Sequence, residues 1–84
     1  MITVRFFAQI RERLGVETLS LDLPPGATSV DDVTQLLVAE NSASWDEILN
    51  ADNVIKAVNQ VVVGADHALE SGDELAYFPP VTGG

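Results

Sequence analysis

The chain contains no cysteine among its 84 residues. It therefore cannot form a disulfide, use a thiolate as a nucleophile or bind a metal through sulfur. If the protein handles sulfur, no side-chain thiol carries it. The single histidine, His67, is expected in a solvated loop, and one histidine falls short of the three or four protein ligands of a zinc site. No metal site and no bound cofactor are predicted.

Basic residues are also scarce, since four Lys and Arg face 13 Asp and Glu, which gives a net charge of −9. Such a field repels phosphate backbones, so no nucleic-acid partner is expected, whereas a basic protein surface would be attracted. The acidic pairs at 31–32, 46–47 and 73–74 are adjacent in sequence, which suits caps and turns better than acid–base catalysis. The chain lacks a nucleophile elbow and a glycine-rich phosphate loop. We therefore expect a carrier or substrate rather than an enzyme.

Long apolar runs are absent too, and none approaches the length of a membrane span. The sequence enters a strand pattern at Met1 and Ile2, with no basic or apolar leader before it. The apolar fraction of 46% is ordinary for a globular protein. These features predict one soluble, cytoplasmic domain over residues 1–84, with no membrane contact.

Alternating apolar residues predict strands at 2–9, 19–23, 54–58, 61–63 and 74–78, with a looped connection over 64–72. Helical spacing of apolar residues predicts one main helix that starts at the cap Ser29 and ends near residue 40. A capping box of Ser44 and Glu47 predicts a second, short helix, whose Trp45 is expected to pack in the core. A helical turn over 10–14 is expected to close at Gly15. The plan is a two-layer α+β fold, a mixed sheet of about four or five strands on one main helix.

The sheet face away from the helix is expected to stay open to solvent or to a partner. Phe7 falls on the outward side of the first strand. If Val61 and Val63 point inward, Val62 points outward, and Phe78 is on the outward side of the last strand. Phe7, Val62 and Phe78 are therefore predicted to form an apolar patch.

After Phe78 the sequence runs Pro79, Pro80, Val81, Thr82, Gly83 and Gly84. The two prolines favour a stiff, extended conformation, so residues 79–84 are predicted to project as a tail. We expect the chain to end at Gly84, whose α-carboxylate would be an anion at neutral pH and a poor electrophile. The hypothesis is that this carboxyl group, activated as an acyl adenylate by an ATP-binding partner, is the functional group. The alternative is an ordinary frayed terminus.

The sequence resembles the small, sulfur-carrying subunit of molybdopterin synthase, a ubiquitin-like protein of the β-grasp fold. The resemblance rests on residues 6–12 (FFAQIRE), 57–60 (AVNQ), 66–67 (DH), 72–74 (GDE) and 78–84 (FPPVTGG). These stretches lie across nearly the whole chain, whereas residues 15–54 match in pattern only. Tyr77 stands where many members have a second phenylalanine.

The resemblance implies a mechanism and partners. A ubiquitin-activating-like adenylyltransferase would adenylylate Gly84 with ATP and magnesium, and a sulfurtransferase would convert it to a thiocarboxylate. The tail would then enter the large subunit, within an expected heterotetramer, and donate sulfur to a cyclic pterin precursor of the molybdenum cofactor. Phe7, Val62 and Phe78 match the family's apolar contact surface, and Arg11 matches a basic contact residue. Catalytic residues would lie in the large subunit.

Three alternatives remain open at this point. The first is a sulfur carrier for thiamin thiazole synthesis, which shares the Gly-Gly ending. The second is a ubiquitin-like modifier, conjugated to lysines through Gly84. The third is an interaction module whose tail is inert.

Overall fold

The computed structural model describes residues 1–23 and 28–79. Along the chain the elements are β1 (Ile2–Phe6), α1 (Ala8–Leu14), β2 (Thr18–Leu21), β3 (Thr28–Ser29), α2 (Val30–Glu40), α3 (Ala43–Leu49), β4 (Ile55–Val58), β5 (Val61–Val63), β6 (Ala68–Leu69) and β7 (Glu74–Phe78). All the predicted strands and helices are present, but their bounds differ. The sequence pattern predicts the first strand over 2–9, whereas residues 8–9 form the start of α1, which is longer than the predicted turn over 10–14.

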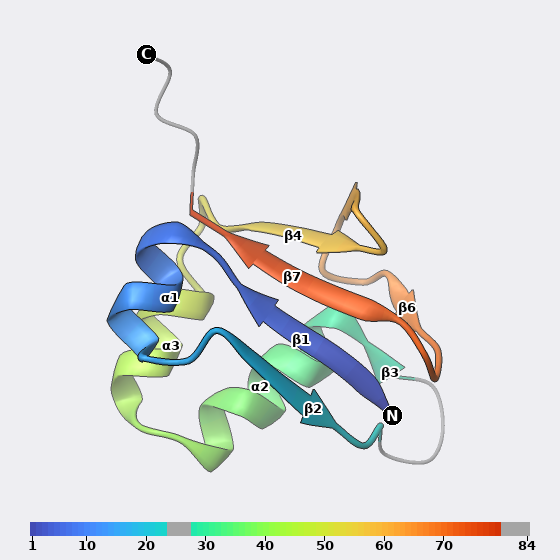
Figure 1. Cartoon of the computed structure of the whole chain (residues 1–84), viewed down its shortest axis with the longest axis horizontal. Helices are drawn as coiled ribbons and strands as arrows, with labels where there is room; N and C mark the ends of the chain where they lie inside the picture. The colour runs from blue at the N-terminus through green and yellow to red at the C-terminus, as the bar shows by residue number, and fades with distance from the viewer. Residues whose placement is uncertain (24–27, 80–84) are drawn as a thin grey trace.

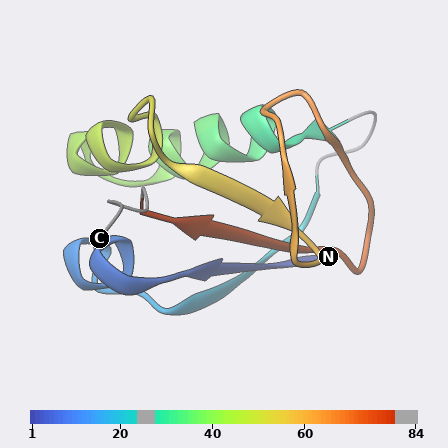
Figure 2. The ribbon, with the colours of Figure 1, turned by 90° about the horizontal axis from the view of Figure 1, so that it is seen from above.

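The main sheet has five strands in the order β2-β1-β7-β4-β5. The central pair, β1 and β7, is parallel, and the other neighbours are antiparallel. Helices α2 and α3 cover one face of this sheet, while the other face carries no helix (Figures 1 and 2). The predicted two-layer α+β architecture with a mixed sheet is confirmed.

The core fills the space between the sheet and α2. Its largest fully buried side chains include Phe6, Leu37, Leu75 and Tyr77. The ring of Phe6 stacks on Tyr77 with centroids 5.5 Å apart and meets Trp45 edge-on at 5.6 Å. Trp45 is 8% exposed, so its predicted packing role is confirmed.

Two helix ends follow the sequence signals. Ser29 is the N-cap of α2 and forms a full capping box with Asp32, since each side chain accepts a hydrogen bond from the other residue's backbone N–H. Gly15 ends α1 at φ 74°, a left-handed conformation that glycine adopts without steric cost. These two positions fix where the helices start and stop around the sheet.

Two local predictions are wrong. Helix α3 begins at Ala43 with Ser42 as its N-cap, so the expected capping box of Ser44 and Glu47 does not form. The predicted loop over 64–72 contains β6, which pairs with β3 in a second, two-stranded sheet. Val61 lies on the inner face, as predicted, because its register partner Val58 is buried, but it is 63% exposed because β5 is the outermost strand. No helix in the described ranges has the length and apolar character that a bilayer crossing needs.

Candidate functional site

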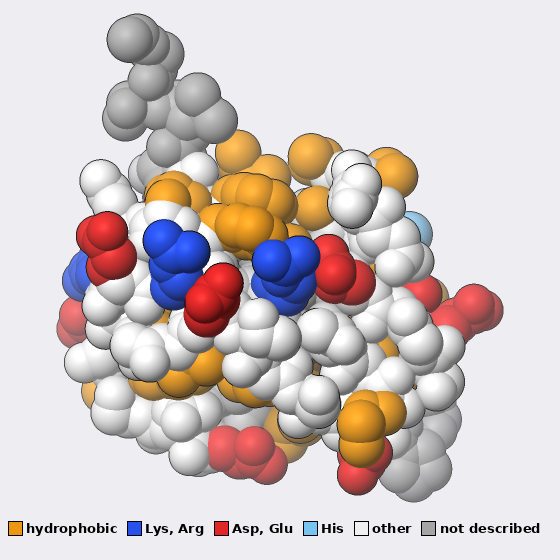
Figure 3. Space-filling model, viewed as in Figure 1, with side chains coloured by type: hydrophobic (Ala, Val, Ile, Leu, Met, Phe, Trp, Pro, Cys, Tyr) orange, Lys and Arg blue, Asp and Glu red, His pale blue; other side chains and the backbone are white. Residues whose placement is uncertain are grey.

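An apolar groove of about 830 Å³ lies on the open face of the sheet and extends along β7, from Glu74 to Phe78. Figure 3 shows hydrophobic side chains gathered on the upper part of this face, with Lys and Arg side chains along the margin. The lining residues used below are Arg5, Phe7, Ile55, Ala57, Val62, Ala76, Phe78 and Pro79. The predicted patch of Phe7, Val62 and Phe78 is confirmed as one surface.

Phe7 and Phe78 meet because their strands run parallel. The register pairs Phe6 with Tyr77, and the Phe7 N–H donates to the Tyr77 carbonyl at 3.2 Å. The next side chain on each strand therefore falls on the open face at the same level. The two rings stack with centroids 4.5 Å apart and planes 8° from parallel. Such a stack contributes about 0.5–1.5 kcal/mol beyond its buried area.

Arg5 adds a positive charge to the groove. Its guanidinium carbon lies 5.1 Å from the centroid of the Phe7 ring, within cation–π distance. Arg5 Nη1 also lies 3.8 Å from the Glu74 carboxylate, in a pair that is partly exposed to solvent and therefore weak. Sequence reasoning missed Arg5 as a site residue. The signal was available, because Arg5 is two positions before Phe7 and shares its outward face.

The floor of the groove is made of small side chains. Ala57 of β4 and Ala76 of β7 are register partners, and both are almost fully buried. Two facing alanines on adjacent strands leave a depression, and Ile55, Val62 and the Phe7–Phe78 stack rise around it. Sequence reasoning also missed these alanines, because an alanine has no chemical signature of its own.

The predicted tail residues lie only partly within the described ranges. Pro79 is the last described residue, and it lines the groove beside Phe78. The remaining tail positions lie outside the described residues: Pro80, Val81, Thr82, Gly83 and Gly84. Arg11 lies exposed in the last turn of α1 and does not line the groove. Its contact role stays a prediction.

Two titratable groups near the site stabilise the strands that frame it. Tyr77 lies on the buried face of β7, and burial raises the pKa of its phenol far above the usual range. Its hydroxyl lies 2.7 Å from Thr34 Oγ1 of α2. The pKa of Asp73 is lowered, first because its carboxylate accepts a hydrogen bond from the Glu70 N–H and second because it accepts one from the Asn59 side chain.

The described residues offer docking rather than chemistry. No three His, Asp or Glu side chains among residues 1–23 and 28–79 gather closely enough to hold a metal ion. His67 lies exposed on the connection between β5 and β6, outside the groove, as expected for a loop residue. The groove presents an apolar floor, one aromatic stack and one cation, which together suit the binding of an apolar protein surface.

The sequence model of the "ThiS family" matches residues 4–84, which is almost the whole chain. The chain belongs to the ThiS family. Among its members, the "Molybdopterin synthase sulfur carrier subunit" of Escherichia coli K12 is 43% identical over 86 residues, with both chains covered completely. The "Small archaeal modifier protein 1" of Haloferax volcanii is 33% identical, with 95% of this chain and 97% of the relative covered.

Solved structures show the same ThiS-family fold. The putative molybdopterin converting factor subunit 1 of Pyrococcus furiosus superposes with a TM-score of 0.77 at 30% identity, covering 95% of this chain and 97% of that one. A complex of subunits 1 and 2 of molybdopterin-converting factor from Helicobacter pylori contains a chain that matches with a TM-score of 0.68 at 24% identity, covering 99% and 97%. The resemblance and the ubiquitin-like β-grasp fold expected from the sequence are confirmed.

Proposed function

We propose that this chain is the sulfur carrier subunit of a molybdopterin synthase and that the carboxyl group of Gly84, converted to a thiocarboxylate, is the sulfur donor. The observation that carries the proposal is the full-length match to the Escherichia coli sulfur carrier subunit. The groove beside Pro79 supports it, because a partner seated there would hold the start of the tail. The chain itself supplies no catalytic side chain in this scheme.

Activation would proceed in two steps, adenylylation of Gly84 and then replacement of AMP by sulfur. A carboxylate oxygen of Gly84 attacks the α-phosphorus of ATP, which releases pyrophosphate and leaves an acyl adenylate with AMP as the leaving group. Sulfur at the sulfide level then attacks the carbonyl carbon, AMP departs, and the thiocarboxylate remains. Where the sulfurtransferase holds this sulfur as a persulfide, the acyl disulfide that forms first is cleaved by a thiol reductant, which releases the thiocarboxylate. ATP and magnesium belong to the activating enzyme, a ubiquitin-activating-like adenylyltransferase, and a sulfurtransferase supplies the sulfur. Glycine at the tip helps because a missing Cβ removes the main steric bar to close approach.

The groove would then bind the large subunit of the synthase, which provides the catalytic residues for sulfur transfer to the cyclic pterin precursor. In the Helicobacter pylori protein, subunits 1 and 2 of molybdopterin-converting factor form a protein–protein complex, which supports such a pairing here. The stacked rings of Phe7 and Phe78 would be the apolar centre of the contact, with Val62 at its rim. Arg11 would contribute a basic contact outside the groove. We place the complex, a heterotetramer, in the cytoplasm.

A second candidate is a ubiquitin-like modifier, favoured by the 33% identity to a small archaeal modifier protein. Both candidates use an activated Gly84, but their products differ. A carrier gains the mass of one sulfur-for-oxygen exchange, whereas a modifier is found in isopeptide-linked ladders on other proteins. A sulfur carrier for another pathway would show the same mass gain without restoring molybdopterin formation.

The test is intact mass of the purified chain after incubation with an adenylyltransferase, ATP, magnesium and a sulfur donor, followed by molybdopterin formation with the large subunit. Deleting Gly84, or changing it to leucine, should abolish sulfur loading and transfer. The amide spectrum and thermal unfolding should stay unchanged, since the core is built from residues that precede the tail. Sulfur transfer by the Gly84 deletion would contradict the proposal, and so would an inert tail in the unmodified chain.

A further inference from the structure

The outermost strand of the main sheet, β5, is apolar along its whole length. It consists of three valines, of which Val61 is 63% exposed and Val62 is 70% exposed. Natural edge strands are commonly protected from pairing by a charge, a proline or a bulge. Val61–Val63 contains no charged residue and no proline. β5 is short, which limits how far a ladder can extend, but it carries no charge or proline that would block an added strand.

The backbone of β5 is also oriented for pairing. β4 and β5 are joined by a two-residue hairpin, in which Val58 pairs with Val61 and the turn residues Asn59 and Gln60 have φ of 50° and 72°. These angles are those of the type I′ turn that matches strand twist. In such a hairpin the closing pair is hydrogen-bonded, so the alternation directs the N–H and C=O of Val62 away from β4, toward the open edge.

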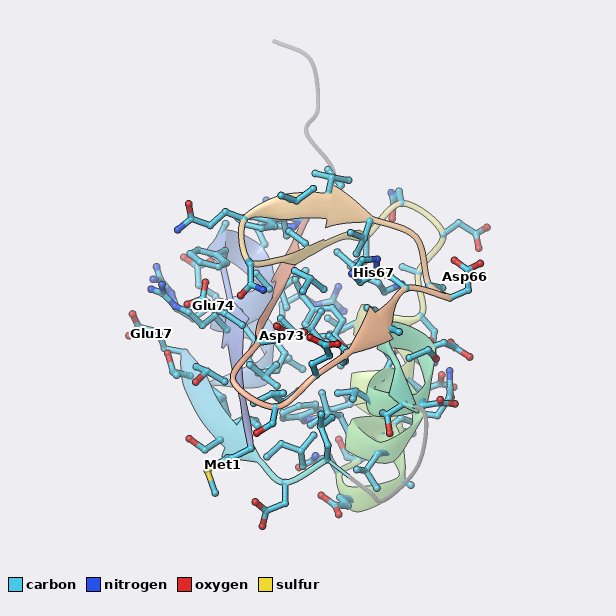
Figure 4. All side chains as sticks on the ribbon, turned by 90° about the vertical axis from the view of Figure 1, so that its right-hand side faces the viewer. Met1, Glu17, Asp66, His67, Asp73 and Glu74 are labelled. Atoms are coloured by element: carbon cyan, nitrogen blue, oxygen red, sulfur yellow. The ribbon has the colours of Figure 1, made fainter. Side chains whose placement is uncertain are left out.

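The two faces of β5 border two different surfaces. Val62 lines the apolar groove, beside Ala57. On the opposite face Val61 and Val63 line a second hollow of about 520 Å³, which also includes Glu70 and Asp73. Figure 4 shows His67 and Asp66 on the connection after β5, and Asp73 just before β7. One face of the edge is therefore apolar, and the other has an acidic border.

We propose that β5 is a docking edge for an extended, basic segment of a partner protein, which adds to the main sheet as a further strand. Side chains directly opposite each other in a ladder point to the same face. The partner residue opposite Val62 is therefore apolar and enters the groove. The residues on either side of it face the second hollow and are Lys or Arg, opposite Glu70 and Asp73.

Charge selects a foreign partner over a second copy of this chain. Two copies paired through β5 would bring two sets of Glu70 and Asp73 together, and each chain carries a net charge of −9. A basic segment would instead neutralise the charges of Glu70 and Asp73, while its backbone would form hydrogen bonds with the N–H and C=O of Val62. Like charges placed opposite each other destabilise a pair, and opposite charges stabilise it.

This inference goes beyond the proposed function, because it concerns strand addition at the edge and requires no sulfur chemistry. Its test uses no activating enzyme. The probe is an acetylated heptapeptide of alternating lysine and valine, added to the full chain while backbone amide shifts and hydrogen exchange are followed. We expect the Val62 amide to shift and to become protected from exchange. We also expect a peptide with one N-methylated central valine to bind about tenfold more weakly, the effect of one lost backbone hydrogen bond.

Two protein variants separate backbone pairing from side-chain contact. Val62→Pro removes the N–H and is tolerated on an edge strand, whereas Val62→Thr keeps the N–H and the branched shape. The proline variant should bind the plain peptide about tenfold more weakly, because the Val62 N–H that donates to a peptide carbonyl is gone, whereas the threonine variant should bind it like the parent. The peptide comparison also stands without either variant, if Val62→Pro fails to fold.

Three results would overturn the proposal. The first is equal affinity for the plain and N-methylated peptides. The second is equal affinity for a heptapeptide in which aspartate replaces lysine. The third is protection of Val62 that depends on protein concentration in the absence of peptide, which would assign the edge to a homodimer.

Discussion

The hydrogen bond between Tyr77 and Thr34 joins the central strand to the main helix inside the core. Both side chains are fully buried, and their oxygens lie 2.7 Å apart. Thr34 Oγ1 donates its proton to the Val30 carbonyl at 2.9 Å. Since a threonine has one hydroxyl proton, Tyr77 is the donor in the pair. The two single substitutions therefore leave different groups without a partner.

Tyr77→Phe removes a donor but leaves Thr34 bonded to Val30. We expect a loss of about 1 kcal/mol in the free energy of unfolding. Thr34→Val keeps the side-chain shape but leaves the Tyr77 hydroxyl buried without an acceptor, which costs about 2 kcal/mol. In the double variant no hydroxyl is left unpaired, so the cost should return to about 1 kcal/mol. Each kcal/mol corresponds to about 4–8 °C in Tm for a domain of this size.

Urea unfolding of the four proteins in this double-mutant cycle, followed by tryptophan fluorescence, measures these values. Thr18→Val, at an exposed position of β2, is the matched control and should change stability by less than about 0.5 kcal/mol. If the double variant lost about 3 kcal/mol, the two substitutions would be additive, and the assigned donor and acceptor would be wrong.

Three further predictions concern the same sheet. Because burial raises the Tyr77 pKa, its neutral form stabilises the fold up to about pH 10, and this contribution is lost at higher pH as the unfolded chain ionises. The urea midpoint should therefore fall more steeply above about pH 10 in the parent than in Tyr77→Phe; parallel curves would contradict this. Because the Asp73 pKa is lowered, its contribution is present above about pH 4 and lost as the pH falls through the lowered value. Asp73→Asn should lower the free energy of unfolding by about 1 kcal/mol at pH 7. Its stability should also fall less than that of the parent as the pH is lowered below about 4. An unchanged dependence on acid pH would contradict this. Phe78→Ala should weaken binding to the large subunit at least about tenfold in calorimetry and cost about 1–2 kcal/mol of stability. Normal binding with a large stability loss would place Phe78 in the core instead.

Much of the fold could be predicted because its signals are local. The Ser29 capping box, the left-handed Gly15 and the alternation along β7 each depend on a few neighbouring residues. The patch of Phe7, Val62 and Phe78 could be predicted because the two-residue period of a strand places all three side chains on the outward face. The tail chemistry came from composition and family resemblance, and the described residues leave it as a proposal.

What could not be predicted depends on contacts between distant segments. β3 and β6 are two residues long, too short to show an alternating pattern, and they exist because they pair with each other. The start of α3 at Ala43 has no side-chain cap hydrogen bond to mark it, and its Trp45 packs against Phe6, a residue far away in the sequence. The exposure of Val61 depends on the position of β5 at the edge, which no property of the valine run encodes. The floor of the groove likewise needs the register that sets Ala57 against Ala76.

The strand order explains why the groove and the tail belong together. β7 is the central strand, held on both sides by β1 and β4, so the chain leaves the sheet from its middle. Tyr77 anchors the inner face of that strand to α2, and the next residue, Phe78, stacks on Phe7 on the outer face. Pro79 follows directly and fixes its own φ. Under the proposed function, a partner that binds the groove would therefore receive the tail at a defined point, so that a chain without catalytic side chains could deliver its terminus into the partner's active site.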